Sequence, residues 1–144
     1  MKQLINQFQP SVIISLGLDG TAEAIRVENM AVNLRIDPEA QFPILTFKKV
    51  NNTGPWIQLA TYNVADIITN IESRGITVEP SYSAGFYLCN AILYETLFYQ
   101  QQKQQSVPTG FIHLPPLETQ DPNGMSFESM MQAVTAAISA HISK

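Results

Sequence analysis

The sequence predicts an α/β fold, a three-layer α/β/α sandwich with helices on both faces of a mixed, mostly parallel sheet. Short β-branched runs alternate with longer segments of helical periodicity, at spacings that suit strand–helix–strand crossovers. Apolar residues make up 45% of the 144 residues and are spread along the chain, as is typical of a chain that buries a core. The length fits one domain, residues 1–144.

The first part of the chain predicts a helix and two strands. Residues 2–8 place apolar side chains at helical spacing, and Pro10 ends this amphipathic helix. Residues 11–17 are a β-branched apolar run bounded by proline and glycine, which predicts a buried, central, parallel strand. Residues 24–32 alternate as a second strand, with an irregularity at residues 28–29 where the alternation slips.

The middle of the chain predicts a loop, a helix and a strand. Residues 35–53 contain prolines and an Asn-Asn pair, so we expect mostly loop, with a short edge strand over residues 44–47. An apolar stripe at helical spacing predicts a helix over residues 61–74, with Asn63 as its cap. Residues 76–82 then predict a strand.

The last part of the chain predicts two helices around a short strand. A long helix is expected from Ser83 to the polar tract at residues 100–105, and it carries the densest apolar and aromatic run. Residues 111–114 predict a strand that two prolines stop, and Ser126 caps a final helix over residues 127–142. We expect four side chains of that helix to face inward: Met130, Val134, Ala137 and Ile138.

Charge and patterning exclude several classes of protein. The net charge is −4 and the eight basic residues form no cluster beyond Lys48-Lys49, so we expect no nucleic-acid partner. No apolar stretch approaches the ~20 residues of a membrane span, and residues 1–10 lack the apolar core of a secretory signal. The single cysteine excludes internal disulfides and favours the cytoplasm. We expect neither a metal site nor a nucleotide site, because no ligand spacing suggests a metal and Asp19-Gly20 lacks a phosphate-loop pattern.

Three side chains are candidates for chemistry. Cys89 is either a nucleophile, if an imidazole or a helix amino end lowers its pKa, or buried packing. His113 ends an apolar strand and is either a base or a hydrogen-bonded core residue. Glu28 interrupts an apolar alternation and either orients an imidazole, lies exposed at a sheet edge, or pairs with Arg26. The second histidine, His141, lies near the end of a helix and is expected to be solvated.

The start of the helix that carries Cys89 decides what its backbone can do. If the helix begins at Ser83, Cys89 lies in the second turn, where the helix dipole has faded and a histidine must activate the thiol. If the helix begins nearer Cys89, backbone N–H groups there can hold an oxyanion.

Three segments, in order, resemble the pyroglutamyl peptidase I (pyrrolidone-carboxylate peptidase) family of cysteine peptidases. They are residues 16–33 with Glu28, the run AGFYLCN at residues 84–90 with Tyr94 after it, and residues 110–115, GFIHLP, with His113. Eleven positions separate Gly17 from Glu28 and 24 separate Cys89 from His113, as expected for the family. The resemblance extends from about residue 10 to residue 142.

The resemblance implies a cysteine peptidase that removes amino-terminal pyroglutamyl residues from peptides through an acyl-enzyme. Cys89 is then the nucleophile, His113 the general base and acid, and Glu28 the residue that orients the imidazole. The resemblance also implies no cofactor, a cytoplasmic location and a homo-oligomer. The substrate-binding positions that it suggests are Leu18, Arg35, Ile36, Tyr87 and Leu88.

The chain also departs from the family pattern. We expect it to lack the family's first strand and the glycine- and phenylalanine-rich loop that helps to hold the pyroglutamyl ring. Ala22 stands where the family has arginine, and a substrate-binding turn is reduced to residues 35–38. A lost strand predicts an exposed sheet edge and self-association. The alternatives are an inactive relative or enzyme fragment with a binding or structural role, and a different cysteine hydrolase with an altered substrate.

Overall fold

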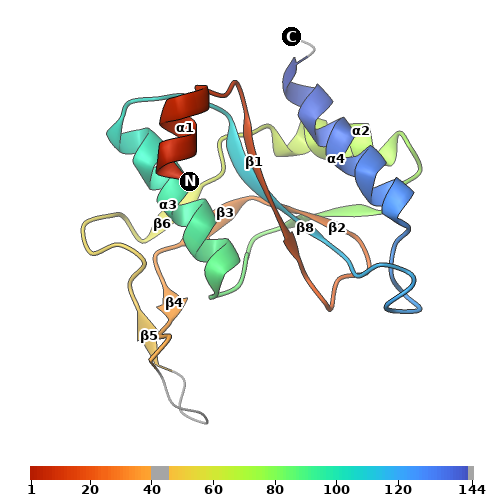
Figure 1. Ribbon diagram of the computed structural model, residues 1–144, viewed down its shortest axis with the longest axis horizontal. Coiled ribbons are helices and arrows are strands. Elements are labelled where there is room, and N and C mark those ends of the chain that lie inside the picture. Colours follow the sequence, from red (N-terminus) through yellow and green to blue (C-terminus); the bar gives the residue numbers. More distant parts are fainter. Residues whose placement is uncertain (40–45, 143–144) are drawn as a thin grey trace.

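The computed structural model describes residues 1–39 and 46–142. These form three layers, with one main sheet between two layers of helices (Figure 1). The four strands of the sheet are arranged in the order β1-β8-β2-β7. Their bounds are β1 Ile13–Leu18, β8 Thr109–Leu114, β2 Ile25–Glu28 and β7 Val78–Ser81. β1 runs parallel to β8 and β7 parallel to β2, while β8 and β2 are antiparallel. The expected mixed, mostly parallel sheet is confirmed.

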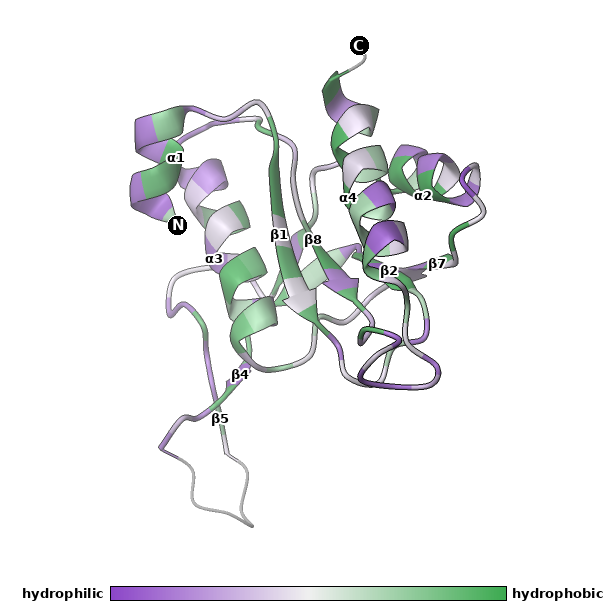
Figure 2. Cartoon of the chain, turned by 45° about the vertical axis from the view of Figure 1, so that its right-hand side comes forward, coloured by the Kyte–Doolittle hydropathy of each residue, from purple (hydrophilic) through white to green (hydrophobic). Residues whose placement is uncertain are grey.

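Two helices cover each face of this sheet. Figures 1 and 2 show α1 and α3 on one side and α2 and α4 on the other, so the expected three-layer α/β/α sandwich is confirmed. The bounds of the helices are α1 Lys2–Phe8, α2 Val64–Glu72, α3 Leu88–Gln102 and α4 Phe127–Ile142.

The position of β1 corrects one prediction. We expected its apolar run to form a central strand, but β1 lies at an edge of the described sheet, and β8 and β2 are the interior strands. Ile13 is buried, whereas Leu16 and Leu18 are 47% and 65% exposed. An apolar run shows that a strand meets helices, but it does not show on how many sides the strand is hydrogen-bonded.

The second predicted strand is in fact two strands. β2 ends at Glu28, and β3 (Met30–Val32) leaves the main sheet to pair antiparallel with β6 (Ile57–Leu59). Asn29 lies between them: its N–H donates to the carbonyl of Ser81, and its own carbonyl accepts from Ala60. The slip in the alternation therefore marks the point where the chain passes from one sheet to another.

A small hairpin projects from the body of the protein (Figure 1). It pairs β4 (Arg35–Ile36) with β5 (Phe47–Lys48) in antiparallel register. The short strand expected over residues 44–47 is described only at its end, because Ile44 and Leu45 lie outside the described residues.

The structure decides between the two helix starts that the sequence left open, and the helix that carries Cys89 begins at the later one. It starts at Leu88 and not at Ser83, which places Cys89 in its first turn. The Ser83 side chain accepts a hydrogen bond from the Gly85 N–H, and Gly85 has a φ of +76°. Such local turn bonding and a left-handed residue keep the preceding segment out of the helix.

The other two helix caps agree with the sequence. The Asn63 side chain accepts from the N–H of Asp66 at the start of α2, and Ser126 accepts from the N–H of Ser129 at the start of α4. Met130 and Ala137 are buried as expected, but Ile138 is 38% exposed and Val134 is only partly buried. Small residues complete the inward stripe of α4 instead: Ala133, Ala136 and Ala140.

The residues of β8 alternate between two hydrophobic cores. Ile112 packs with Ile25 and Val27 under α2 and α4, whereas Phe111 packs against α3. His113 shares the face of Phe111, and their rings lie 4.8 Å apart. The period of two along the strand therefore turns His113 toward the side of the sheet that carries Cys89.

Candidate active site

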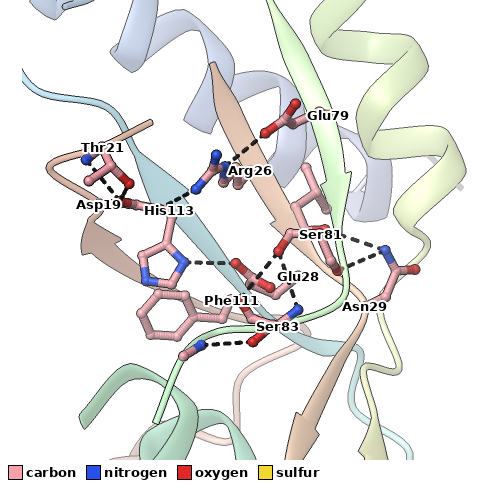
Figure 3. A network of polar contacts seen from close by, with 12 residues as sticks. Asp19, Thr21, Arg26, Glu28, Asn29, Glu79, Ser81, Ser83, Phe111 and His113 are labelled. Atoms are coloured by element: carbon pink, nitrogen blue, oxygen red, sulfur yellow. Dashed lines mark hydrogen bonds and ion pairs between the residues drawn. The ribbon is translucent and has the colours of Figure 1, made fainter. Parts of the chain in front are cut away.

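A buried carboxylate and a buried imidazole form the centre of the site (Figure 3). Glu28 on β2 and His113 on β8 come from adjacent antiparallel strands, and Glu28 Oε1 lies 2.8 Å from His113 Nδ1. Glu28 is 0% exposed and His113 is 7% exposed. A carboxylate on Nδ1 fixes the ring and leaves Nε2 as the nitrogen that exchanges a proton with another group.

Cys89 belongs to α3, and its thiol lies over Gly17 of β1, near the same pair. A Cβ atom placed on Gly17 would lie 3.1 Å from Cys89 Sγ and 2.8 Å from the Phe111 ring. In the parallel register of β1 and β8, Gly17 is directly opposite His113. The thiol therefore lies over the strand position next to the imidazole, and only glycine leaves room for it there.

The electrostatic surroundings of Cys89 differ from the expectation for an activated thiol. Burial raises the pKa of the Cys89 thiol, and the carboxylates of Glu28 and Asp19 raise it further. The sequence left open whether an imidazole or the helix amino end lowers that pKa. A thiol held neutral in this way needs a base at the moment of attack, because the thiolate is the nucleophile.

The first turn of α3 offers backbone donors beside the thiol. Its N-cap, Tyr87, makes no side-chain capping bond, so Leu88 and Cys89 begin the helix with N–H groups that have no intrahelical acceptor. Asn90 anchors this turn: its Nδ2 donates to the carbonyls of Val32 and Leu34 at 2.9 Å, and its Oδ1 accepts from the N–H of Val32. A fixed helix start next to a nucleophile can hold a developing oxyanion.

An apolar hollow of about 340 Å³ opens between β1 and α3 at the thiol. It is lined by Met1, Ile14, Ser15, Leu16, Leu88, Cys89, Ile92 and Phe111. Such a site suits a compact, uncharged group, because a charged group would lose its hydration there.

Of the five substrate-binding residues that the sequence suggested, Leu88 is the one that lines this hollow. The neighbouring Tyr87 is 67% exposed at the helix start. The N–H of Ile36 donates to the carbonyl of Phe86, which ties the hairpin that carries Arg35 to the loop before α3. Leu18 ends β1 one residue after Gly17 and is exposed.

Arg26 belongs to a separate network beside the Glu28–His113 pair (Figure 3). It forms ion pairs with Asp19 and Glu79, in place of the pair with Glu28 that the sequence left open. Burial works to raise the pKa of Asp19, but hydrogen bonds from Thr21 and Arg26 outweigh it and lower the pKa. The loop after β1 thus carries a fixed negative charge near the thiol. Sequence analysis did not identify this network.

The remaining predictions for the site also have outcomes. His141 is not simply solvated: it is partly buried and its ring stacks on Tyr62 with centroids 6.4 Å apart. Sequence analysis used Gly17 only as a position in the family motif and missed its place beneath the thiol, although a glycine inside a strand pattern is a signal of close backbone approach. Among residues 1–39 and 46–142, no group of three His, Cys, Asp or Glu side chains can hold a metal ion. Within the same ranges, no helix has the length and apolar character needed to cross a membrane.

Comparisons with known proteins identify relatives of the chain. A sequence model described as pyroglutamyl peptidase matches residues 1–144. A pyrrolidone-carboxylate peptidase from Thermococcus litoralis is 35% identical over 119 residues, which cover 80% of this chain and 53% of that protein. Another, from Finegoldia magna, is 33% identical over 151 residues, which cover 99% of this chain and 70% of that protein.

Solved structures agree with these relatives. The pyrrolidone carboxyl peptidase of T. litoralis matches with a TM-score of 0.88 and 29% identity, over 99% of this chain and 70% of that one. The pyrrolidone carboxyl peptidase of Pyrococcus furiosus matches with a TM-score of 0.88 and 27% identity, over 99% of this chain and 74% of that one. The chain thus spans from about half to about three quarters of the length of these relatives.

Proposed function

The chain belongs to the pyroglutamyl peptidase family, and on that premise we propose that residues 1–144 form one peptidase-like domain that removes amino-terminal pyroglutamyl residues from peptides. The observation that supports this most directly is the buried Glu28–His113 pair, with Nδ1 and Oε1 at 2.8 Å, beside a thiol that lies over Gly17. A thiol nucleophile, an imidazole base and a third group that orients the imidazole make up the catalytic set of many cysteine peptidases, and a carboxylate can fill the third role.

In the proposed reaction His113 exchanges the protons. Nε2 takes the proton of the Cys89 thiol as Sγ attacks the carbonyl that joins the pyroglutamyl residue to the next residue. The amide bond breaks, a thioester forms on Sγ, and the imidazolium gives its proton to the leaving amine. A water molecule then loses a proton to Nε2, attacks the thioester and releases pyroglutamate, and the thiol is restored.

Glu28 and α3 have supporting roles in the proposed reaction. The Glu28 carboxylate keeps the proton of the neutral ring on Nδ1 and stabilises the imidazolium that forms. The backbone N–H groups in the first turn of α3 face the developing oxyanion. Because burial raises the pKa of Cys89, the thiol rests in its neutral form, and in this proposal proton transfer to His113 accompanies attack.

The proposed substrate fits the apolar hollow by its charge. A pyroglutamyl residue carries a neutral lactam, whereas an ordinary amino terminus carries an ammonium group that an apolar site excludes. Leu88 lines the hollow beside Cys89. We assign substrate contacts around it to Leu18, Arg35, Ile36, Tyr87 and Leu88.

The exposed strand edge and the lone cysteine bear on the oligomeric state and the location of the protein. We propose a homo-oligomer, because β1 is an edge strand of the described sheet and apolar side chains such as Leu4 and Phe8 are exposed beside it. Sedimentation velocity tests this, and a monomer at high concentration contradicts it. We propose the cytoplasm as the location, where a lone thiol such as Cys89 stays reduced.

The alternative is a relative without peptidase activity that serves a binding or structural role. The raised pKa of the Cys89 thiol is the observation that favours it. The deciding experiment is hydrolysis of pyroglutamyl p-nitroanilide by the purified protein, with Cys89→Ala as the control and prolyl p-nitroanilide as the charged comparison substrate. We expect turnover of the first substrate only, and a rate no higher than that of Cys89→Ala overturns the peptidase proposal.

A further inference from the structure

Tyr62 connects the two strands that carry the Glu28–His113 pair. It lies between β6 and α2, is 4% exposed, and belongs to the core under α2 and α4. Its hydroxyl oxygen lies 2.7 Å from the carbonyl oxygen of Phe111 on β8 and 2.9 Å from that of Glu28 on β2. The hydroxyl thus contacts the backbone of the carboxylate residue itself, and the backbone two residues before the imidazole.

The hydroxyl occupies the fork where the two strands separate. The antiparallel register of β2 and β8 pairs Arg26 with His113 and then Val27 with Ile112, where the described pairing ends. One position further, the same register would bring Glu28 opposite Phe111. At this point the chain leaves β2 for β3, and the Tyr62 hydroxyl lies between the two carbonyl oxygens.

Tyr62 is held in place from three directions. Its N–H donates to the carbonyl of Thr109 at the start of β8. Its ring lies against Gly110, where an added Cβ would come within 2.2 Å of the ring carbons. Its ring also stacks on His141. The ring is therefore held in one position, which places the hydroxyl where the two strands separate. Glycine at position 110 of β8 leaves room for the ring.

The hydroxyl has one proton for two acceptors. Burial raises the pKa of Tyr62, and the charge of Glu28 raises it further, so the hydroxyl keeps its proton near neutral pH. Two carbonyl oxygens that face one another in a buried place repel each other unless a donor lies between them. The proton of Tyr62 offsets that repulsion and fixes the separation of the strands.

We propose that Tyr62 is a positioning residue for the Glu28–His113 pair. Its hydroxyl sets the separation of β2 and β8 at the fork, and with it the 2.8 Å distance between Glu28 Oε1 and His113 Nδ1. This inference rests on the proposed function for its kinetic consequence, but its structural consequence does not depend on any activity.

The kinetic test compares Tyr62→Phe with Tyr94→Phe. Tyr94 is the matched control, because its hydroxyl is also bonded to a backbone carbonyl, that of Pro55, which belongs to neither strand. With a pyroglutamyl amide as substrate, we expect Tyr62→Phe to lower kcat by about 10- to 100-fold with KM little changed, as misplacement of a catalytic pair does. We expect its pH profile of kcat/KM to shift on the limb set by the imidazole, and Tyr94→Phe to keep the wild-type profile.

A spectroscopic test is independent of turnover. In ¹⁵N-labelled protein, we expect an Nδ1–H proton of His113 bonded to Glu28 to give a strongly deshielded NMR signal. His141→Gln assigns the signal, because the chain has only two histidines. We expect Tyr62→Phe to move this signal upfield or to abolish it, and Tyr94→Phe to retain it. If Tyr62→Phe is unfolded by circular dichroism, the comparison is repeated in sucrose, which favours the compact state.

The outcomes separate the two proposals. A wild-type protein that does not hydrolyse the amide overturns the proposed function, while the NMR signal still decides the role of Tyr62. A folded Tyr62→Phe variant with an unchanged NMR signal overturns the role of Tyr62, and so does an active one with the kcat and pH profile of the wild type.

Discussion

The two faces of the main sheet differ in how completely the helices cover them. Under α2 and α4, Ile112 packs into a core that includes Ile25, Val27 and the alanines of α4. Under α3, the neighbouring residue His113 meets Glu28 and Phe111, and a hollow reaches Cys89. Adjacent residues of one strand thus lie in different environments: Ile112 is in a closed core and His113 is in a candidate active site.

This difference shows where a small α/β protein can carry polar chemistry. A closed apolar face supplies the free energy of burial. The other face then has room for a buried ionisable pair, which is costly unless its members satisfy each other. Glu28 and His113 do so at Oε1 and Nδ1, although Glu28 Oε2 has no hydrogen-bond partner among the described residues.

The largest expected effect comes from comparing substitutions of two adjacent residues of β8, one on each face of the sheet. His113→Gln removes the proposed base, and we expect kcat on a pyroglutamyl amide to fall by about 10²- to 10⁴-fold. Ile112→Val, on the closed face, removes one methyl group from the core, and we expect it to cost about 1 kcal/mol of stability with kcat unchanged. Steady-state kinetics and urea unfolding of both variants measure the two effects. Equal losses of kcat in the two variants would contradict a division of labour between the faces.

A smaller effect is expected from filling the space over Gly17. In Gly17→Ala the new Cβ would lie 2.8 Å from the Phe111 ring and 3.1 Å from Cys89 Sγ, so one of them must move. We expect a loss of about 1–3 kcal/mol of stability and slower alkylation of Cys89 by iodoacetamide. Gly20→Ala is the control, because a Cβ there meets nothing within 4 Å. Gly17→Ala with the stability and alkylation rate of Gly20→Ala shows that the contact over Gly17 is unimportant.

The smallest expected effect concerns the negative charge of Asp19 near the Cys89 thiol, on the face of the sheet under α3. Asp19 raises the pKa of the Cys89 thiol, so Asp19→Asn removes a negative charge that disfavours the thiolate. The pH profile of Cys89 alkylation is then expected to move to lower pH, by less than about one unit. Glu79→Gln removes the other carboxylate that pairs with Arg26 and is expected to leave the profile in place. A shift of the Asp19→Asn profile to higher pH is the result that rejects this account.

Local signals made much of the fold predictable. The cap residues Asn63 and Ser126 begin α2 and α4 as expected, because a cap acts through neighbours in sequence. The slip at residues 28–29 correctly indicated an irregular strand. The sequence missed that this slip is a change of sheet, because a period of two shows which way side chains point but not which strand pairs with which.

Non-local features account for the errors and omissions. The edge position of β1 depends on strand order, which pairs it with a strand almost 100 residues later in the chain. The Asp19–Arg26–Glu79 network joins a loop to two strands, and no spacing in the sequence marks it. The two contacts of the Tyr62 hydroxyl could not be predicted from the sequence either, because they join it to residues 34 and 49 positions away.

The sequence by itself determined the fold class, most of the elements and the three side chains on which the proposed chemistry depends, because composition, periodicity and motif order are written along the chain. Only the tertiary structure decided that Glu28 meets His113, that Cys89 lies over Gly17 in the first turn of α3, and that this happens on the less covered face of the sheet. The physical reason is that these contacts join separate strands and helices, and their distances are fixed by how the sheet and its two layers of helices pack together.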